Sequence, residues 1–465
     1  MARPAREKKR LRLYQIRRDI GAVSAAAFLR LGEGGGRGLW ASGNRWVAHA
    51  GALHELTVGD GTGGPEHGEG RCRFGSVQNR AAKLFARIGG EGRARIFGGF
   101  AFSAQPRGDR VWSRFPPARF QLPAAELEHD PRAGRCSLLV RGRGREEAEQ
   151  RWIRWAEALA QECTIEAPGV ARRRSPEAMG GRTTPRGDRA AWSRMVWRTL
   201  RRIRAGEAQK VVLARTLDVT PAMRVAPLDL ALSLWEESHG SHVFLFEPVA
   251  GEAVVGAAPE TIASLVNGVV RATAVAGSVG VGADSVETAQ LARRLFSSEK
   301  DRAEHDFVVQ DMVARLTALG CSVRRDVEPH VLTLARIQHL ETKIAAGIPD
   351  GVTLLDIVAS LHPTPAVCGM PRNVALSILT GNEAFDRGWY AGPVGWLASD
   401  GRGIFVPALR SAVSRGVGWR LFAGAGIVPG SDPGLEWEET ELKFDAVLRA
   451  MVRAEVAPRS AIGSA

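Results

Sequence analysis

The stretch Thr261-Ile-Ala-Ser-Leu-Val-Asn-Gly-Val-Val-Arg-Ala-Thr-Ala-Val-Ala276 decides the fold class of this chain. Two runs that favour β-structure meet at Asn267-Gly268, and this dipeptide is a strong signal for a two-residue hairpin turn. Residues 210–219, 242–246 and 253–256 have the composition of further buried strands. We therefore predict antiparallel sheet in this region, not an alternation of strands and helices.

Helical patterns interrupt the strand-rich stretches. Helical spacing is found in residues 190–205, in residues 285–296, and in a segment that begins at Ser297 or Ser298 and ends near Leu319, with Gly320 as its stop. Residues 388–396 and 403–412 have strand patterns with tight turns, and Lys443 is predicted to begin a closing helix. Strands interrupted by long helices predict an α+β fold.

Composition shifts predict how the chain is divided. Residues 171–188 are rich in Gly, Pro, Arg and Thr without apolar periodicity, which predicts an exposed connection between two halves. We predict a basic, flexible segment over residues 1–19, an N-terminal half over 20–170, a second half over 189–455 and a flexible tail over 456–465.

The bulk composition excludes several classes of protein. Five cysteines without CxxC spacing argue against a disulfide scaffold or a zinc site and favour a reducing compartment. No apolar run reaches the roughly 18 residues of a membrane span, and the basic N-terminus lacks the apolar segment of a secretory signal. We therefore expect a cytoplasmic protein without a membrane span.

The formal net charge of +13 raises the alternative of a nucleic-acid or membrane-surface partner. Apart from residues 1–19, however, the basic residues are spread along the chain and do not form a stripe. We expect no nucleic-acid partner, while a general positive field would attract a small dianionic substrate.

A small-residue turn and a group of carboxylates near the C-terminus predict a binding site. Gly424 and Gly426, in Phe422-Ala-Gly-Ala-Gly-Ile-Val-Pro429, allow backbone N–H groups to approach an anion. In Glu436-Trp-Glu-Glu-Thr440, Glu436 and Glu439 share one face of a helix, where they repel each other unless a cation lies nearby. A hard divalent metal with oxygen ligands is the natural candidate.

Other candidate residues are ambiguous one at a time. Lys210 begins a strand and Glu260 follows one, and both positions are common for solvated charges. His362, in Leu-His-Pro-Thr-Pro, is compatible with a turn or a core histidine. Arg410 lies in an apolar strand pattern, where a buried guanidinium needs either an internal salt bridge or an anionic ligand.

The order of eight motifs is more specific than any single residue. The motifs are Lys-Val-Val-Leu-Ala-Arg (210–215), Gly-Ala-Ala-Pro-Glu (256–260), Ala-Gly-Ser (276–278), Ser-Glu-Lys-Asp-Arg-Ala-Glu-His (298–305), Leu-His-Pro-Thr-Pro-Ala (361–366), Arg-Gly-Trp-Tyr-Ala-Gly-Pro-Val-Gly (387–395), Ala-Gly-Ala-Gly-Ile-Val (423–428) and Glu-Trp-Glu-Glu-Thr (436–440). In this order they resemble the chorismate-binding enzymes, which include isochorismate, salicylate, anthranilate and aminodeoxychorismate synthases. The resemblance implies large antiparallel sheets that form a sandwich surrounded by helices.

The resemblance also implies a mechanism in which water adds at C2 of chorismate while the C4 hydroxyl leaves. Lys210 matches the general base that activates the water, and it must be uncharged to do so. Glu260 matches the general acid that protonates the departing hydroxyl, so its pKa must be raised. Glu304 and Glu439 match the ligands of a Mg²⁺ cofactor, and Glu436 matches a further acidic position beside them.

The remaining matches concern substrate binding. Arg410 matches the arginine that holds the pyruvyl carboxylate, for which a planar bidentate donor is suited. Further substrate contacts are implied for Tyr390, Gly277, Ser278, His362, Ala366, Gly424, Gly426 and Lys443. Serine at 278 stands where many relatives have threonine, so it keeps the hydroxyl and loses the methyl group.

Three positions discriminate among the relatives. Lys210 stands where anthranilate-type enzymes commonly have glutamine, which favours water over ammonia and implies no glutaminase subunit. Ala276 stands where aminodeoxychorismate synthases have a nucleophilic lysine. Ala366 and Arg95-Ile-Phe-Gly-Gly-Phe-Ala-Phe102 resemble isochorismate synthases, the latter those of the menaquinone type.

Isochorismate synthase is therefore the predicted activity. Salicylate synthase, an anthranilate-synthase-type subunit and a scaffold that has lost catalysis stay open as alternatives, as do the menaquinone and siderophore pathways.

Overall fold

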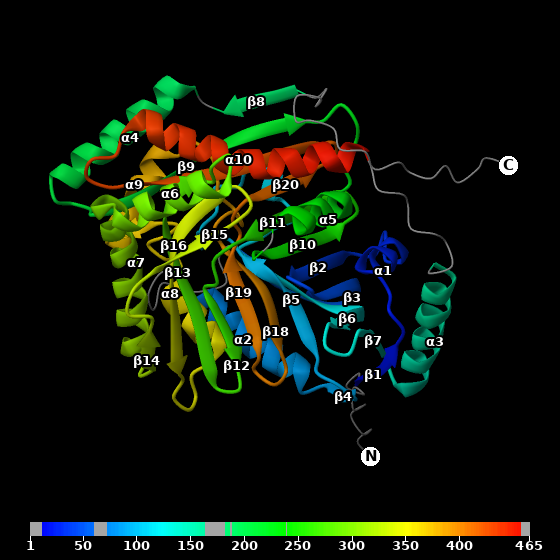
Figure 1. Ribbon diagram of the computed structural model, residues 1–465. Coiled ribbons are helices and arrows are strands. Elements are labelled where there is room, and N and C mark those ends of the chain that lie inside the picture. The colour runs from blue at the N-terminus through cyan, green and yellow to red at the C-terminus, as the bar shows by residue number, and fades with distance from the viewer. Residues whose placement is uncertain (1–11, 60–71, 163–181, 187, 239, 457–465) are drawn as a thin grey trace, which may run out of the picture.

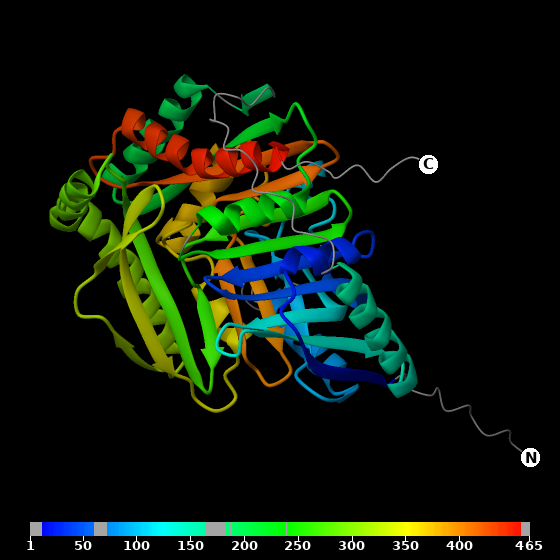
Figure 2. The ribbon, with the colours of Figure 1, turned by 45° about the vertical axis from the view of Figure 1, so that its right-hand side comes forward.

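The strands form two large sheets that face each other, and helices cover their outer surfaces (Figures 1 and 2). This arrangement comes from a computed structural model of the 465-residue chain, which describes all residues except 1–11, 60–71, 163–181, 187, 239 and 457–465. The α+β class and the sandwich expected from the sequence are confirmed.

The first sheet is antiparallel except for one parallel pair at its edge. In spatial order its strands are β8 (Arg182–Arg186), β9 (Lys210–Thr220), β21 (Gly418–Ile427), β20 (Ser411–Arg415), β11 (Glu252–Ala258), β10 (His242–Val249), β2 (Arg37–Ser42), β3 (Arg45–Val58), β6 (Ala118–Asp130), β7 (Arg135–Gly142), β1 (Leu13–Ile20) and β4 (Ile88–Gly90). The short strand β17 (Gly369–Met370) pairs with the first residues of β9.

The second sheet branches from the first at β6. Its strands are β5 (Arg95–Phe100), β18 (Pro393–Ala398), β19 (Gly403–Pro407), β12 (Ala263–Val266), β13 (Val269–Gly280) and β16 (Ile337–Gly347), with β14 (Ser322–Arg325) and β15 (His330–Thr333) both on β16. Residues 118–121 of β6 pair with β5, while residues 125–130 pair with β7. One long strand therefore belongs to both sheets.

The helices lie on both outer faces and at one end of the sandwich. Those packed on the first sheet are α1 (Ala25–Leu31), α3 (Arg145–Glu162), α5 (Pro227–Glu237) and α10 (Pro433–Val456). Those packed on the second sheet are α2 (Cys72–Phe85), α7 (Glu299–Ala318) and α8 (Leu354–Leu361). The remaining helical elements are α4 (Arg189–Arg204), α6 (Ser285–Ser297), α9 (Arg372–Asn382) and the short η1 (Arg110–Trp112). Figure 1 shows α10 crossing the top of the molecule beside α4.

The buried apolar side chains form a central layer and two outer layers. Trp40, Phe97 and Phe422 belong to the central layer, which lies between the sheets. Leu39 and Ala41 flank Trp40 in β2 and belong to the layer beneath the helices of the first sheet. Successive side chains of a strand point to opposite faces, so a strand that is covered on both sides has an uninterrupted apolar sequence.

Several elements agree closely with the prediction. The hairpin turns at Asn267-Gly268, whose φ angles of +52° and +73° are those of a turn between antiparallel strands. Helix α7 follows Ser298, whose Oγ accepts a hydrogen bond from the backbone N–H of Asp301. Gly320 ends this helix with a φ of +80°.

Two predicted elements begin or end elsewhere. The strand pattern over residues 403–412 is divided into β19 and β20, because Arg410 has a φ of +44° and cannot continue the ladder. The closing helix begins at Pro433, ten residues before Lys443. Proline is favoured at a first helical position, and Asp432 Oδ1 accepts hydrogen bonds from the next two backbone N–H groups. Glu436, Glu439 and Lys443 therefore lie on one helix.

The predicted division of the chain needs correction at two places. Residues 13–19, predicted to be flexible, belong to strand β1. Arg182–Arg186, within the predicted connection, form the edge strand β8. Residues 1–11, 163–181, 187 and 457–465 lie outside the described residues. Strands of the two predicted halves pair directly, β2 with β10 and β5 with β18.

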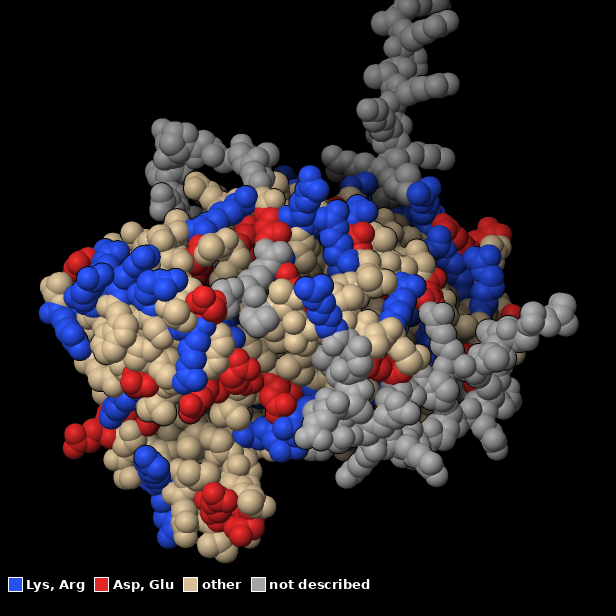
Figure 3. All heavy atoms as spheres, turned by 90° about the horizontal axis from the view of Figure 1, so that it is seen from above, with Lys and Arg blue, Asp and Glu red and all other residues tan. Residues whose placement is uncertain are grey.

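The described helices and the charges on one face of the molecule bear on the alternative of a membrane or nucleic-acid partner. No helix there is long and apolar enough to cross a bilayer. On the face seen from above, Lys and Arg side chains are interspersed with Asp and Glu (Figure 3). Basic side chains are densest at the left of that view. Helix α4 carries the exposed residues Arg194, Arg198 and Arg201.

Candidate active site

Most of the predicted site residues meet in one cavity between the sheets, bounded by α7 and α10. Eleven of them line it: Glu260, Gly277, Ser278, Glu304, Ala366, Tyr390, Arg410, Gly424, Gly426, Glu439 and Lys443. They come from strands of both sheets, from both bounding helices and from connecting segments. The fold therefore assembles them from positions that span almost 200 residues of sequence.

Lys210 lies directly beside this cavity. It begins β9 and is 1% exposed, and its Nζ lies 2.9 Å from Oε1 of Glu304 on α7. This distance is that of an ion pair, although the orientation of the two groups does not make a hydrogen bond. A buried lysine at this place is held next to the substrate cavity by a carboxylate that itself lines the cavity.

Gly426 provides the space for this pair. It lies on β21, in register with Val212 on β9. A Cβ atom at Gly426 would lie 2.5 Å from Oε1 of Glu304 and 3.2 Å from Cε of Lys210. The first contact is closer than real Cβ atoms approach, and the second is tight, so a larger residue would require Glu304 to move.

Glu260 is a buried acid on the wall of the cavity. It follows β11, is 1% exposed, and its Oε1 has no hydrogen-bond partner among the described residues. Burial raises the pKa of Glu260 to about 8, although the positive charge of Lys210 acts in the opposite direction. The carboxyl group is therefore protonated at neutral pH and can donate a proton.

Each of the three predicted metal-site glutamates is paired with a lysine. Besides the Lys210–Glu304 pair, Lys300 Nζ lies 3.2 Å from Glu436 Oε1, and Lys443 Nζ lies 2.6 Å from Glu439 Oε1. Burial and the nearby charge of Glu439 raise the pKa of Glu436 to about 7, and Lys300 counteracts this. Glu436 is buried but does not line the cavity.

The donor set fits a magnesium ion that is completed by substrate and water. Glu304 and Glu439 present carboxylate oxygens to the same cavity, and Mg²⁺ is commonly held by one or two carboxylates together with substrate oxygens and water. Among the described residues no group of three or more His, Cys, Asp or Glu side chains forms a preformed metal site.

The opposite side of the cavity is suited to an anion. Arg410 has no carboxylate partner among the described residues, and its Nη2 donates a hydrogen bond to Nε2 of His339 at 2.8 Å. Burial lowers the pKa of Arg410 to about 10, which still leaves the guanidinium charged at neutral pH. Tyr390 is buried nearby, and burial raises the pKa of its hydroxyl. Lys443 donates to the carbonyl oxygen of Gly424 at 2.8 Å, which positions its ammonium group at the cavity.

One predicted contact residue lies away from the cavity. His362 is buried between Phe74 and Phe102, and its Nε2 lies 3.0 Å from the carbonyl oxygen of Phe102. It does not line the cavity, whereas Ala366 does. His362 therefore holds the segment that leads to Ala366 and does not itself face the cavity.

Sequence reasoning missed His339 and Lys300. His339 lines the cavity and lies opposite Ser278 in the pairing of β13 with β16. This neighbour relation depends on the register of two strands about 60 residues apart, which no local pattern reveals. Lys300 lies within the quoted motif of residues 298–305, but its pairing with Glu436 depends on how α7 and α10 pack.

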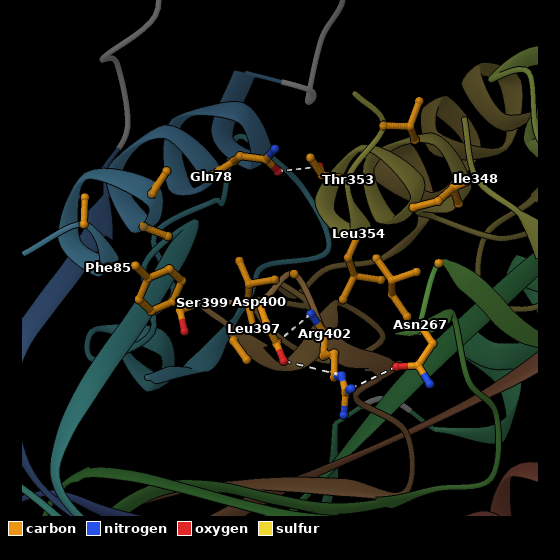
Figure 4. A pocket seen from close by; sticks show the side chains of 18 residues that line it. Gln78, Phe85, Asn267, Ile348, Thr353, Leu354, Leu397, Ser399, Asp400 and Arg402 are labelled. Carbon is orange, nitrogen blue, oxygen red and sulfur yellow. Dashed lines mark hydrogen bonds and ion pairs between the residues drawn. The ribbon is translucent and has the colours of Figure 1, made fainter. Parts of the chain in front are cut away.

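A larger groove at the far end of the second sheet lacks this chemistry. Its volume is about 820 Å³, against about 90 Å³ for the cavity described above. Figure 4 shows its apolar walls from Phe85 and Leu397 and its polar rim, where Arg402 bonds to Asn267 at 2.9 Å. It contains none of the predicted site residues. The chemistry of the lining, and not size, therefore identifies the candidate site.

Comparisons with known proteins find similar sequences that cover most of this chain. The family model described as chorismate binding enzyme matches residues 2–452. The chain is 33% identical to "Salicylate biosynthesis isochorismate synthase" of Pseudomonas aeruginosa, over 83% of this chain and 80% of that protein. It is 30% identical to "Isochorismate synthase MenF" of Bacillus subtilis, over 77% of this chain and 74% of that protein.

Solved structures share the fold of this chain. The menaquinone-specific isochorismate synthase MenF of Escherichia coli superposes with a TM-score of 0.74 at 26% identity, covering 95% of this chain and 94% of that one. Anthranilate synthase component I of Streptococcus pneumoniae shares the fold with a TM-score of 0.70 at 18% identity, covering 88% of this chain and 92% of that one.

Proposed function

The chain belongs to the chorismate-binding enzyme family, and from this premise we propose that it is an isochorismate synthase. The reaction is an isomerisation in which water adds at C2 of chorismate, the C4 hydroxyl leaves as water, and the ring double bonds shift. Relatives that cover most of this chain carry this activity in their names.

The observation that carries the proposal is the buried acid Glu260 in the same site as the buried amine of Lys210. Hydroxide is a poor leaving group, so the C4 hydroxyl needs a proton donor that lets it depart as water. Glu260 has that proton at neutral pH because burial raises its pKa to about 8. The attacking water needs a proton acceptor, and we assign this role to Lys210, whose Nζ lies 2.9 Å from Oε1 of the cavity residue Glu304.

Lys210 can accept a proton only when its ammonium group has lost one. In the substrate-free protein, Glu304 stabilises that ammonium group through the 2.9 Å contact. Glu304 and Glu439, with Glu436 beside them, would hold a Mg²⁺ ion, which would supply positive charge for a carboxylate of the substrate. Gly426 keeps Glu304 and Lys210 close together by leaving room for both side chains.

The anion-binding side of the cavity orients the substrate. Arg410 uses Nη2 for its contact with His339, which leaves Nη1 and Nε to donate to a carboxylate. We assign the pyruvyl carboxylate to this guanidinium, with the hydroxyls of Tyr390 and Ser278 and the ammonium of Lys443 along the same wall. Orientation at both carboxylates fixes C2 and C4 relative to Lys210 and Glu260.

Water, and not ammonia or an enzyme amine, is the proposed nucleophile. Ala276 lines the cavity with a methyl group, so it cannot supply the nucleophilic amine of an aminodeoxychorismate synthase. Lys210 is the residue that favours water, and we therefore expect no glutaminase subunit as partner.

The test is product analysis with the purified full chain, chorismate and Mg²⁺. We expect chromatography to show isochorismate that forms only with Mg²⁺ present, without salicylate or pyruvate. Lys210→Ala and Glu260→Gln serve as matched inactive controls. Salicylate together with pyruvate would assign a salicylate synthase, and no turnover at any Mg²⁺ concentration would reject the enzyme altogether.

A further inference from the structure

His339 makes polar contacts with two parts of the anion-binding wall. It lies on β16, opposite Ser278 on β13, and its side chain lines the cavity. Its Nε2 lies 2.8 Å from Nη2 of Arg410. Its Nδ1 lies 3.1 Å from the carbonyl oxygen of Gly277 and 3.0 Å from Oγ of Ser278. The imidazole therefore links Arg410 to the Gly277–Ser278 backbone.

These partners fix which nitrogen carries the proton. A guanidinium group only donates hydrogen bonds, so Nε2 of His339 must be the unprotonated nitrogen. A carbonyl oxygen only accepts, so Nδ1 must carry the hydrogen that points to Gly277. Burial and the positive charges of Arg410 and Lys443 hold the pKa of His339 well below its ordinary value, which keeps the ring neutral.

A neutral partner has a specific advantage for Arg410. Several buried arginines elsewhere in the described part of the chain are paired with carboxylates, for example Arg387 with Glu383 and Arg95 with Glu126. A carboxylate beside Arg410 would neutralise the guanidinium and repel an incoming carboxylate. An imidazole nitrogen holds the guanidinium by a hydrogen bond and leaves its full charge for a ligand.

We propose that His339, as the neutral ring with the proton on Nδ1, is a positioning residue that holds the Arg410 guanidinium and the Gly277–Ser278 backbone in place for the substrate's carboxylate. This inference rests on the proposed function and assigns a role to a residue outside the acid, base and metal sets. Because the carbonyl oxygen of Gly277 and Oγ of Ser278 share the single hydrogen on Nδ1, the hydroxyl hydrogen of Ser278 is left free to donate to the substrate.

Two isosteric substitutions separate the two contacts. In His339→Gln, the amide oxygen can occupy the place of Nε2 and accept from Arg410. In His339→Asn, the shorter amide can replace Nδ1–H and donate to Gly277, but it cannot reach Arg410. We expect KM for chorismate within about threefold of wild type for His339→Gln. We expect KM about tenfold or more higher for His339→Asn, with kcat changed less, because a hydrogen bond to a charged group is lost.

A double-mutant cycle tests whether His339 acts through Arg410. The effect of His339→Asn on KM should disappear in an Arg410→Ala background, since there is then no guanidinium to hold. An equal effect in both backgrounds would overturn the proposal, as would wild-type KM in His339→Asn, or equal impairment in His339→Gln and His339→Asn. The melting temperature, measured in parallel, shows whether a variant is folded.

The tautomer can be measured in the wild-type protein without any turnover. Nitrogen NMR of the protein labelled at its 10 histidines should show one buried ring with the proton on Nδ1, and this signal should be absent from His339→Gln. A proton on Nε2 of His339, or on both nitrogens, at neutral pH would refute the inference. Failure of wild type to convert chorismate would reject the proposed function instead, so the two failures are distinguishable.

Discussion

The raised pKa of Glu260 has a consequence for stability that can be measured apart from catalysis. The perturbation is Glu260→Gln, which keeps the shape of the side chain and removes its proton equilibrium. In wild type the folded chain retains the Glu260 proton up to about pH 8, while the unfolded chain releases it near pH 4.5, the ordinary pKa of a glutamate. Between these two values the folded state binds the extra proton, so the free energy of unfolding must fall as pH rises.

The size of the effect follows from the two pKa values. Each pH unit between them removes about 1.4 kcal/mol of stability, since one pKa unit corresponds to that free energy. From pH 5 to pH 7.5, wild type should therefore lose about 3 kcal/mol relative to Glu260→Gln. The full effect is present below pH 4.5 and exhausted above about pH 8. Glu436 also has a raised pKa, but it is common to both proteins and cancels in the comparison.

The assay is urea unfolding of wild type and Glu260→Gln without Mg²⁺, at half-unit steps from pH 5 to pH 8. The observable is the difference in the free energy of unfolding between the variant and wild type, followed as a function of pH. A part of this difference that is the same at every pH carries no information about the Glu260 proton. The difference should shift by about 3 kcal/mol in favour of the variant across the range. Parallel stability curves would show that Glu260 is ionised at neutral pH, and its assignment as the general acid would then fail.

Further outcomes concern the base, the anion clamp and the metal site. Lys210→Ala should abolish turnover and leave chorismate binding measurable by calorimetry; near-normal kcat would reject Lys210 as the base. Arg410→Ala should raise KM by about tenfold to a hundredfold through loss of a charged hydrogen-bond donor, and an unchanged KM would contradict the carboxylate assignment. Glu439→Ala should raise the Mg²⁺ concentration for half activity, and the same Mg²⁺ requirement as wild type would remove Glu439 from the metal site. Gly426→Ala should impair activity and Mg²⁺ binding together, because its Cβ would lie 2.5 Å from Oε1 of Glu304; wild-type values would show that Glu304 can move at no cost.

The local elements and the composition of the site were largely predictable from the sequence. Asn267-Gly268 specifies a hairpin by backbone chemistry alone, and Ser298 specifies a helix start through its side-chain hydroxyl. The start of α10 was also encoded, in Asp432-Pro433, but the predicted start at Lys443 overlooked that signal. Arg410 was misplaced in a strand because its left-handed backbone conformation, which glycine normally adopts, is imposed by tertiary structure.

Contacts between distant elements could not be predicted from the sequence, because they depend on how the strands and helices pack. His339 reaches Arg410 and Ser278 only because β16 pairs with β13 in one register, and a shift by one residue would turn its side chain to the other face. Likewise, the pairing of Lys300 with Glu436 depends on the packing of α7 beside α10. Such relations are properties of the assembled sheets, whereas the motif order identifies only which residues are available.

The arrangement of charges shows why a chain with net charge +13 can recognise one small dianion. Lys210, Lys300 and Lys443 each have a glutamate partner, so these cations add little net field at the cavity. Glu260 is protonated and adds none. Among the described residues that line the cavity, Arg410 is the cation without a carboxylate partner, and its neighbour His339 is neutral. On the proposed assignment this guanidinium orients one carboxylate of the substrate, whereas the overall positive field only favours encounter. An acidic residue in place of His339 would leave the chain basic. It would nevertheless neutralise the guanidinium of Arg410, which would then no longer attract a carboxylate.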